Sequence, residues 1–231
     1  RHLQENNGIS GNTNAAFEMA TGTYVALLDH DDLLTPDALY EMAIAVESNP
    51  ATDMMYSDED KVSADLRAYF NPHYKPDYNP ELLRTNNYIC HFLAVKRELA
   101  IRAGYFRPDY DGAQDYDFIF RCVELAQHIH HIPRILYHWR SHAESTAANP
   151  QSKRYAYEAG KRALESHLIR NNIEAIVSHT PHLGFYRVQY RIKITHDSDH
   201  CCLHISENAA NPPLILKEVK QELISNCMRP D

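Results

Sequence analysis

The sequence has no long apolar run. Its longest apolar stretches, such as residues 24–28 (YVALL), are far shorter than the ~20 residues that a membrane-spanning helix needs. No secretory signal peptide opens the chain. The five cysteines are odd in number and form no CxxC pair, which argues against a disulfide framework and against a zinc ribbon. These absences predict a cytoplasmic protein with no transmembrane segment.

Positive charge is also scarce. The chain has 23 Lys and Arg against 31 Asp and Glu, which gives a net charge of −8 at pH 7, and no basic stripe is visible. Such a chain repels the phosphates of DNA and RNA, so we expect no nucleic-acid partner. With 231 residues, 44% of them hydrophobic and 23% charged, the composition is that of an ordinary globular protein with a fair-sized core.

Segments with strand character alternate with segments of helical periodicity. The predicted strands are 24–28, 53–57, 89–95, 129–137 and 184–194, and the predicted helices are 12–21, 36–48, 115–127 and 153–171. The helix from Pro36 has Leu39, Met42, Ala43 and Val46 on its expected apolar face. The alternation predicts an α/β protein with a mostly parallel sheet, in which ligands bind at the carboxyl ends of strands.

Three carboxylates follow the first predicted strand. Asp29, Asp31 and Asp32 stand within four residues, and like charges at such density need a cation or strong hydrogen-bond donors to compensate them. Mg²⁺ or Mn²⁺ would do so, with one or two carboxylates, water and substrate phosphates as ligands. The alternative is that the acids only cap the helix that begins near Pro36.

A second acidic pair, Asp115 and Asp117, begins the helix predicted at 115–127. One carboxylate suffices as a helix cap, so the other is available to accept a proton from a hydroxyl nucleophile. Arg121 is expected to pair with acids of its own helix rather than with substrate.

Several runs together resemble a known family. They are NNGISGNTNAAFEMATGTYVALLDHDDLLTPDAL, YSDEDKV, KPDYNPELL, GAQDYDFIFR and IPRILYHWRSHAEST. In order and spacing, from about Glu5 to about Lys193, they resemble the family 2 glycosyltransferases, particularly bacterial enzymes of O-antigen and rhamnan assembly. The resemblance implies a Rossmann-like GT-A fold and transfer, with inversion, of a sugar from a nucleotide-diphospho-sugar donor to a saccharide or lipid-linked saccharide acceptor in cell-surface polysaccharide synthesis.

The resemblance also assigns residues to the donor. Asp29 and Asp31 match the D-x-D motif, which binds the donor ribose and a divalent metal, Mn²⁺ or Mg²⁺, on its diphosphate; Asp32 extends the motif. His142 falls where some relatives supply a further metal or diphosphate contact, although a capping or core role is equally open. The motif therefore implies that Asp29, Asp31 and Asp32 bind the donor.

On the acceptor side, Asp115 matches the acid that deprotonates the acceptor hydroxyl. Gln114 stands where many relatives have Glu, which leaves the base itself intact. We expect Asp58, Glu59 and Asp60 to line the donor-sugar and acceptor side, with a solvated loop as the alternative.

The domain organisation follows from the same comparison. We expect residues 1–150 to form a GT-A catalytic domain that is incomplete at its N-terminus, residues 151–194 to add a helix and an edge strand to it, and residues 195–231 to be a divergent tail. Relatives begin with a strand, helix and strand that form the base pocket. Without these first strands the chain is expected to expose an apolar sheet edge and to be a fragment with impaired activity, peripheral at most to the cytoplasmic face of the inner membrane.

Two rival functions remain. The run LLDHDDLLT is similar to the D-x-D-x-T strand end of haloacid-dehalogenase-like, Mg-dependent phosphatases, although Leu33 stands where Thr or Val is needed. The other rival is a non-catalytic remnant that still binds a sugar nucleotide. The histidines His128, His130, His131 and His138 are expected on the surface, because alternation along a strand divides them between two faces.

Overall fold

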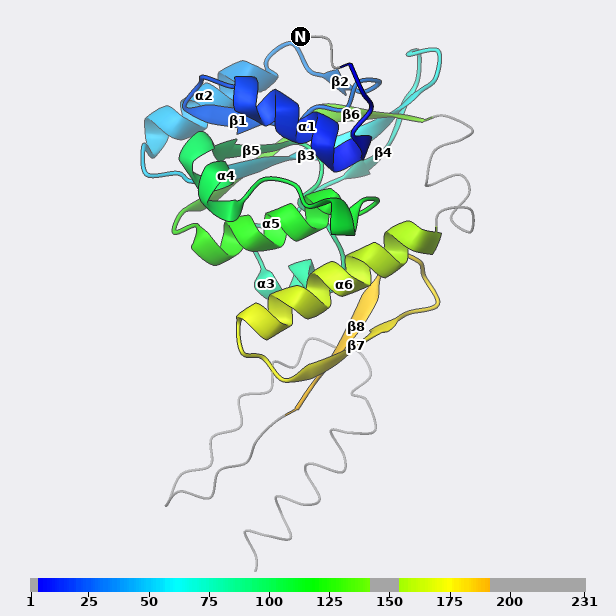
Figure 1. Cartoon of the computed structure of the whole chain (residues 1–231). Coiled ribbons are helices and arrows are strands. Elements are labelled where there is room, and N and C mark those ends of the chain that lie inside the picture. Colours follow the sequence, from blue (N-terminus) through cyan, green and yellow to red (C-terminus); the bar gives the residue numbers. More distant parts are fainter. Residues whose placement is uncertain (1–3, 142–153, 192–231) are drawn as a thin grey trace, which may run out of the picture. The chain divides into compact units, whose positions relative to one another are not determined.

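The computed structural model describes residues 4–141 and 154–191. All of them belong to one compact unit, residues 1–192 (Figure 1). In these two ranges no helix combines the length and the apolar character that a membrane crossing requires. The domain boundaries expected from the sequence stay a prediction.

The main sheet has six strands in the order β1-β5-β3-β6-β2, with β4 paired to β3. The strands are β1 (Tyr24–Ala26), β2 (Leu33–Leu34), β3 (Met54–Ser63), β4 (Tyr69–His73), β5 (Leu93–Lys96) and β6 (Ile129–Ser141). β1, β3 and β6 run in one direction, and β2, β4 and β5 run in the other. The expected α/β class is confirmed, and the sheet is mixed around a parallel core.

The parallel pairing of β3 with β6 is the longest ladder and it is irregular in the middle. Its register shifts on both sides of Asp58, opposite a part of β6 that contains Pro133. Proline has no N–H to donate to a ladder and is tolerated in strands at such irregularities. The shift places the acidic run of β3 opposite Ile135, Tyr137 and His138.

Helices cover both faces of the sheet. The helices are α1 (Gly8–Met19), α2 (Ala38–Ser48), α3 (Pro80–Leu83), α4 (Arg97–Ala103), α5 (Gln114–Leu125) and α6 (Arg154–Arg170), with a 3₁₀ turn at Pro108–Tyr110. Met54 and Met55 are adjacent in β3 and therefore point to opposite faces. Met54 joins a core with residues of α1, α4, α5 and α6, whereas Met55 joins a core with residues of α2.

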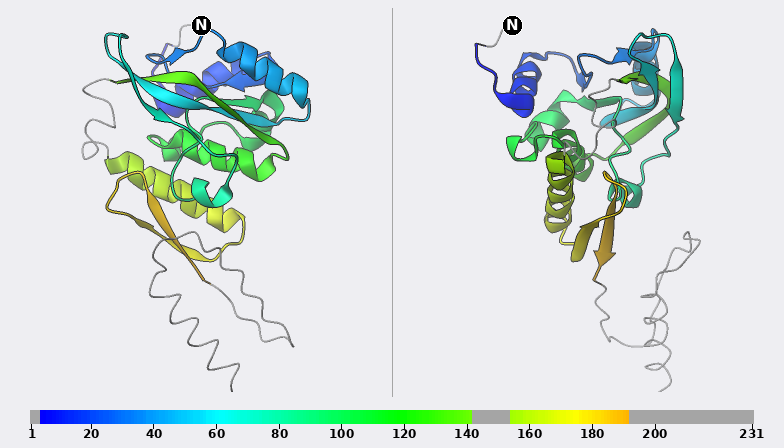
Figure 2. Two further views of the ribbon diagram at one scale, coloured as in Figure 1. Left: turned by 180° about the vertical axis from the view of Figure 1, so that it is seen from behind. Right: turned by 90° about the vertical axis from the view of Figure 1, so that its right-hand side faces the viewer.

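A second, two-stranded sheet consists of β7 (Ala175–His179) and β8 (Tyr186–Tyr190), which are antiparallel. Figures 1 and 2 show α6 beside α5 and the β7–β8 hairpin beyond α6. Val177 and Tyr186 of this hairpin are buried in the same core as α5 and α6. The hairpin therefore packs onto the α5 side of the main sheet.

Three sequence expectations on the elements are wrong. The continuous apolar run 24–28 predicts a strand covered on both faces, but Tyr24 and Val25 are half-buried and Ala26 is exposed, since β1 ends the strand order and, within the described residues, pairs only with β5. α2 begins after Asp37 and buries Ala38, Met42 and Ala45, leaving Leu39 68% exposed. The polar run 69–80, rich in Tyr and Pro, predicts a loop, but it contains β4, an exposed edge strand that tolerates Pro72.

Candidate functional site

The acids that follow β1 lie in a turn, in which the Asp32 N–H donates to the Asp29 carbonyl at 3.2 Å. The Asp29 side chain is 64% exposed and that of Asp31 is 37% exposed. His30 Nδ1 lies 3.7 Å from Asp31 Oδ1, at a ring that is almost fully exposed. Asp29 and Asp31 are thus accessible carboxylates at the carboxyl end of a strand.

Asp32 differs from its two neighbours because it is buried. It accepts hydrogen bonds from the Tyr137 hydroxyl and, at 2.7 Å, from the Arg140 N–H, both on β6. Burial raises the pKa of Asp32 above its ordinary value, although both hydrogen bonds act in the opposite direction. Asp32 therefore anchors the turn to β6, and its expected contact with the donor stays a prediction.

The acidic run of β3 is buried and paired, so the solvated-loop alternative is wrong. Asp58, Glu59 and Asp60 are each at most 8% exposed. Asp58 accepts from the Lys75 N–H at 2.9 Å and contacts His131 Nε2 at 2.8 Å. Their expected position on the donor-sugar and acceptor side stays a prediction.

Two histidines expected on the surface have largely enclosed side chains instead. The His131 side chain is 5% exposed and pairs with Asp58, and that of His138 is 14% exposed and pairs with Asp60. The cause is the irregular β3–β6 register, which places carboxylates and imidazoles side by side on neighbouring strands.

Glu59 is the most strongly held carboxylate of this run. Lys75 Nζ lies 3.4 Å from Glu59 Oε2, and the Lys75 side chain is fully buried. His73 Nδ1 lies 3.5 Å from Glu59 Oε1. Burial opposes ionisation of Glu59, but hydrogen bonds from His73 and His91 and the charge of Lys75 hold its pKa well below the usual range. Glu59 is therefore a fixed negative charge.

His91 connects Glu59 with the acids that follow β1. Its Nδ1 lies 3.6 Å from Glu59 Oε2, and its Nε2 lies 3.7 Å from Asp29 Oδ2. Its ring stacks on Tyr137 with a centroid distance of 5.0 Å. Burial alone would lower the pKa of His91, but Glu59, Asp29 and Asp115 together raise it above its ordinary value.

Asp115, on α5, acts on Cys90 and His91. Its Oδ2 accepts a hydrogen bond from Asn87 Nδ2 at 2.8 Å. Its charge adds to the effect of burial in raising the pKa of the Cys90 thiol, and it acts on the His91 ring as well. We call the group of Asp29, Glu59, His91 and Asp115 the His91 cluster. It brings the acids that follow β1 together with the acid at the start of α5.

Gln114 and Asp117, the neighbours of Asp115 at the start of α5, have structural roles. Gln114 Oε1 accepts from the Gly112 N–H at 2.8 Å and fixes the loop before α5. Asp117 is fully buried and accepts from Arg107 Nε at 2.9 Å and from Arg121 Nη2 at 2.7 Å. The expected local pairing of Arg121 is confirmed, and Asp117 is not available as a base.

His91 is the residue of this site that the sequence analysis missed. The run ICHFLAV was expected to be a strand throughout, whereas β5 begins only at Leu93. The segment before it brings Cys90 and His91 to the acids. A histidine inside an apolar run is the one signal that could have drawn attention to it.

A divalent metal fits the accessible acids. The described part of the chain contains no group of three or more His, Cys, Asp or Glu that could hold a metal ion. Mg²⁺ and Mn²⁺ do not require such a cage, because one or two carboxylates together with water and substrate phosphates complete their shell. Asp29 and Asp31 are hard oxygen donors of that kind. His142, the third expected ligand, lies outside the described residues.

Three comparisons with known proteins, by family model, by sequence and by structure, give consistent results. Residues 1–103 match the model of glycosyl transferase family 2. An uncharacterized protein of Sinorhizobium fredii is 45% identical over 177 residues, which are 75% of this chain and 19% of that protein. The O-antigen biosynthesis protein RfbC of Myxococcus xanthus is 38% identical over 183 residues, which are 79% of this chain and 14% of that protein. The chain thus spans less than a fifth of these curated relatives.

Among solved structures, the crystal structure of residues 1–349 of S. aureus TarS matches with a TM-score of 0.52. The match is 18% identical in sequence and covers 72% of this chain and 47% of that one. The same TarS fragment has also been solved in complex with UDP. At this level of identity the likeness concerns the fold alone.

Proposed function

We propose that this chain, which belongs to glycosyl transferase family 2 and has the Rossmann-like GT-A fold, transfers a sugar from a nucleotide-diphospho-sugar to a saccharide acceptor with inversion at the anomeric carbon. The observation that carries the proposal is the His91 cluster. Asp29 Oδ2 lies 3.7 Å from His91 Nε2, and Asp115, from an element far along the chain, helps to raise the pKa of the same imidazole and of the adjacent Cys90 thiol. A donor-binding acid and a proton acceptor therefore flank one space.

Asp115 is the proposed general base. Its described neighbours Asn87 and Cys90 are neutral, whereas Arg107 and Arg121 neutralise Asp117. In the proposed step the acceptor hydroxyl oxygen attacks the anomeric carbon, and its proton passes to the Asp115 carboxylate. The bond from that carbon to the diphosphate oxygen breaks, and the diphosphate leaves with the electron pair.

Asp29 and Asp31 are the residues that would hold a divalent metal together with the donor diphosphate. Such a metal supplies positive charge that stabilises the departing diphosphate. Asp29 is itself held toward the site, because its N–H contacts the Tyr137 hydroxyl at 3.3 Å and its carboxylate faces His91. Tyr137 also binds Asp32, so one side chain of β6 positions the whole turn.

The relatives support the substrate class. The TarS structure with UDP and the name of the O-antigen biosynthesis protein support a nucleotide-sugar donor and a role in cell-surface polysaccharide synthesis. A lipid-linked acceptor and a location on the cytoplasmic side are part of the same proposal. No comparison favours the phosphatase alternative.

Calorimetry with Mn²⁺ and a panel of nucleoside diphosphates tests the proposal. We expect one diphosphate to bind the chain, and Asp29→Asn together with Asp31→Asn to weaken that binding at least ~10-fold, the loss of roughly one charge-assisted contact. Asp65→Asn, a change in the exposed turn after β3, is the control and should bind as the unaltered chain does.

Turnover separates the rival functions. Free nucleoside diphosphate released from a nucleotide sugar supports the proposal. Release of phosphate from a phosphomonoester would overturn it in favour of a phosphatase. Nucleotide binding with no sugar released or transferred would overturn the enzymatic part and leave a sugar-nucleotide-binding remnant.

A further inference from the structure

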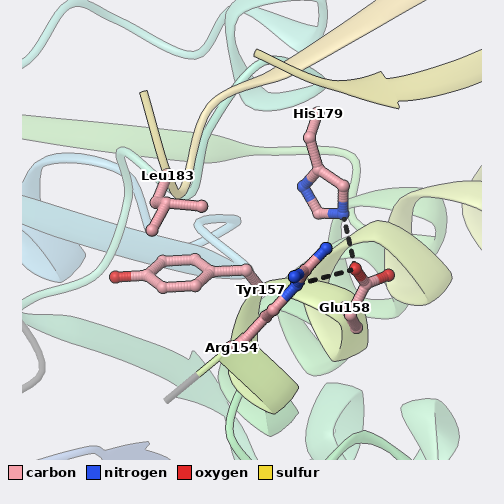
Figure 3. A pocket seen from close by; sticks show the side chains of 5 residues that line it. All are labelled: Arg154, Tyr157, Glu158, His179 and Leu183. Carbon is pink, nitrogen blue, oxygen red and sulfur yellow. Dashed lines mark ion pairs between the residues drawn. The ribbon is translucent and has the colours of Figure 1, made fainter. Parts of the chain in front are cut away.

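A pocket outside the His91 cluster lies between the first turns of α6 and the β7–β8 hairpin (Figure 3). Its volume is about 220 Å³. The residues that line it are Arg154, Tyr157, Glu158, His179 and Leu183. This volume is below the roughly 300–1,000 Å³ of pockets that hold drug-sized ligands, so the pocket has room for a single ring and not for a nucleotide.

The lining combines apolar surface with one fixed carboxylate. Tyr157 and Leu183 present an aromatic ring and an aliphatic side chain, while Glu158 lies among the polar groups. His179 Nε2 lies 3.2 Å from Glu158 Oε1, and Arg154 Nε lies 4.0 Å from it. Contact with His179 holds the pKa of Glu158 below its ordinary value, so the carboxylate stays ionised.

The pocket also contains a ring nitrogen with no partner. Both ring nitrogens of His179 are shielded from solvent, and in the described part of the chain neither makes a hydrogen bond; Nε2 has the ion pair with Glu158, whereas Nδ1 has none. Figure 3 shows it turned away from Glu158. A shielded polar atom of this kind is unfavourable unless a ligand or a water satisfies it. Glu158 therefore offers a hydrogen-bond acceptor to a ligand that carries hydroxyl groups, beside an imidazole whose Nδ1 is unsatisfied.

Tyr186 links the pocket to the proposed base. Its hydroxyl donates to the Tyr157 carbonyl at 3.0 Å, and its ring lies 5.7 Å from that of His179. On its other side the ring stacks on Tyr116, the residue after Asp115, and besides burial the charge of Asp115 helps to raise the pKa of Tyr186. The ring of Tyr186 thus connects the pocket with the residue next to the base.

The loop that leads into α5 touches the same helix turn. Gly112 has φ +98°, and a Cβ added there would lie 3.0 Å from the Cα of Ala156 and closer still to the Tyr155 ring. Only glycine allows both this backbone conformation and this close approach. The first turn of α6 is therefore fixed against the segment that carries the base.

We propose that this pocket binds a sugar ring of the acceptor saccharide, a ring other than the one whose hydroxyl reacts. A pyranose offers C–H faces to Tyr157 and Leu183 and adjacent hydroxyls to Glu158 and His179. The pocket is too small for a nucleotide, which argues against the donor as occupant. The base touches the acceptor, so an acceptor subsite is expected on the flank of Asp115. This inference rests on the proposed function.

The test titrates the full chain, labelled with ¹³C in its histidines, with neutral methyl glycosides of hexoses and deoxyhexoses and with their disaccharides. We expect at least one of these probes to shift the ring signals of His179. Glu158→Gln should weaken that binding about ten-fold, the loss expected for one hydrogen bond to a charged group. Tyr157→Ala should weaken it too, whereas Tyr157→Phe should not.

The matched control is Glu165→Gln. Glu165 lies on the same helix, its side chain is 41% exposed against 43% for Glu158, and it pairs with Lys161 as Glu158 pairs with Arg154. Saccharide binding that is lost equally in both variants, or kept in both, would overturn the inference. So would the absence of any shift at His179 with every probe.

Calorimetry with Mn²⁺ and nucleoside diphosphates separates this inference from the proposed function. Glu158→Gln should bind the nucleotide as the unaltered chain does. If the nucleotide binds and the glycosides do not, the subsite is wrong and the proposed function stands. If the glycosides bind at His179 and no nucleotide does, the proposed function fails and the assignment of the pocket to an acceptor fails with it.

Discussion

Two carboxylates on α5 stand two residues apart and have opposite surroundings. Asp117 is fully buried between Arg107 and Arg121, which saturate it with charged hydrogen bonds. Asp115 faces the neutral groups Asn87 and Cys90 and acts on the ring of His91. Residue type and position in the helix are thus nearly the same for both. The difference teaches that the partners of a carboxylate decide whether it stabilises the fold or is available for chemistry.

The change with the largest expected effect tests the reactive member of this pair. Asp115→Asn removes the proposed proton acceptor, so sugar transfer should fall by about 10²–10⁴. Nucleotide binding and the melting temperature should change little, because Asp115 forms no ion pair with the residues that the structure describes. Transfer kinetics and calorimetry on one preparation measure both; full turnover in the variant would show that another group is the base.

The matching change at Asp117 should act on stability instead. Asp117→Asn leaves two arginines without their carboxylate, and loss of one partner of a buried pair costs about 3–5 kcal/mol. We expect the free energy of unfolding, measured in urea, to fall by that amount, with Asp115→Asn as the control. Equal unfolding free energies for the two variants would remove the distinction between the two acids.

Tyr137→Phe tests whether the turn after β1 is held by β6. The hydroxyl binds the buried Asp32 carboxylate and contacts the Asp29 N–H, and a buried acceptor that loses its donor costs about 1–3 kcal/mol. We expect that loss of stability together with weaker binding of nucleoside diphosphate and Mn²⁺. Tyr69→Phe, at an exposed position of β4, is the control. A normal nucleotide affinity in Tyr137→Phe would show that the turn is positioned by other contacts.

The smallest expected effect is on the pH dependence of stability. The pKa of Glu59 is lowered in the folded protein, so its contribution is present above the ordinary pKa of glutamate and is lost as the pH falls through the folded value. The pKa of His91 is raised, so its contribution is present below the ordinary pKa of histidine and is lost as the pH rises through the folded value.

Unfolding in urea across pH 3–8 measures the contribution of His91 and the onset of the acid loss, because the folded pKa of Glu59 lies well below the usual range. Glu59→Gln should flatten the acid side of the profile, and His91→Gln should flatten the side near neutral pH. A profile that is the same in the unaltered chain and in both variants would show that neither group is coupled to folding.

The sequence was sufficient for those parts of the site that depend on local pattern. Asp29 and Asp31 follow a strand, and Asp115 opens a helix, where the motifs placed them. The partners of the acidic side chains could not be predicted from the sequence, because they depend on which residues of neighbouring strands lie opposite one another. The pairing of Asp58 with His131 and of Asp60 with His138 depends on the irregular β3–β6 ladder.

The role of His91 was even harder to predict from the sequence. Its partners Asp29, Glu59 and Asp115 come from three separate stretches of the chain, and only the folded sheet brings them together. Asp117 is the converse case: its pairing with Arg121 follows helical spacing and was expected, but the second arginine, Arg107, lies outside the helix. Local spacing therefore predicts pairs within an element, and packing supplies the rest.

The most direct test of the central claim is the pKa of His91, measured by NMR titration of the ¹³C-histidine-labelled chain and assigned with His91→Gln. If Asp29 and Asp115 lie around the same space, Asp29→Asn and Asp115→Asn should each lower that pKa relative to the unaltered chain, since each removes a negative charge near the ring. A pKa of His91 that responds to only one of the two substitutions would contradict the account.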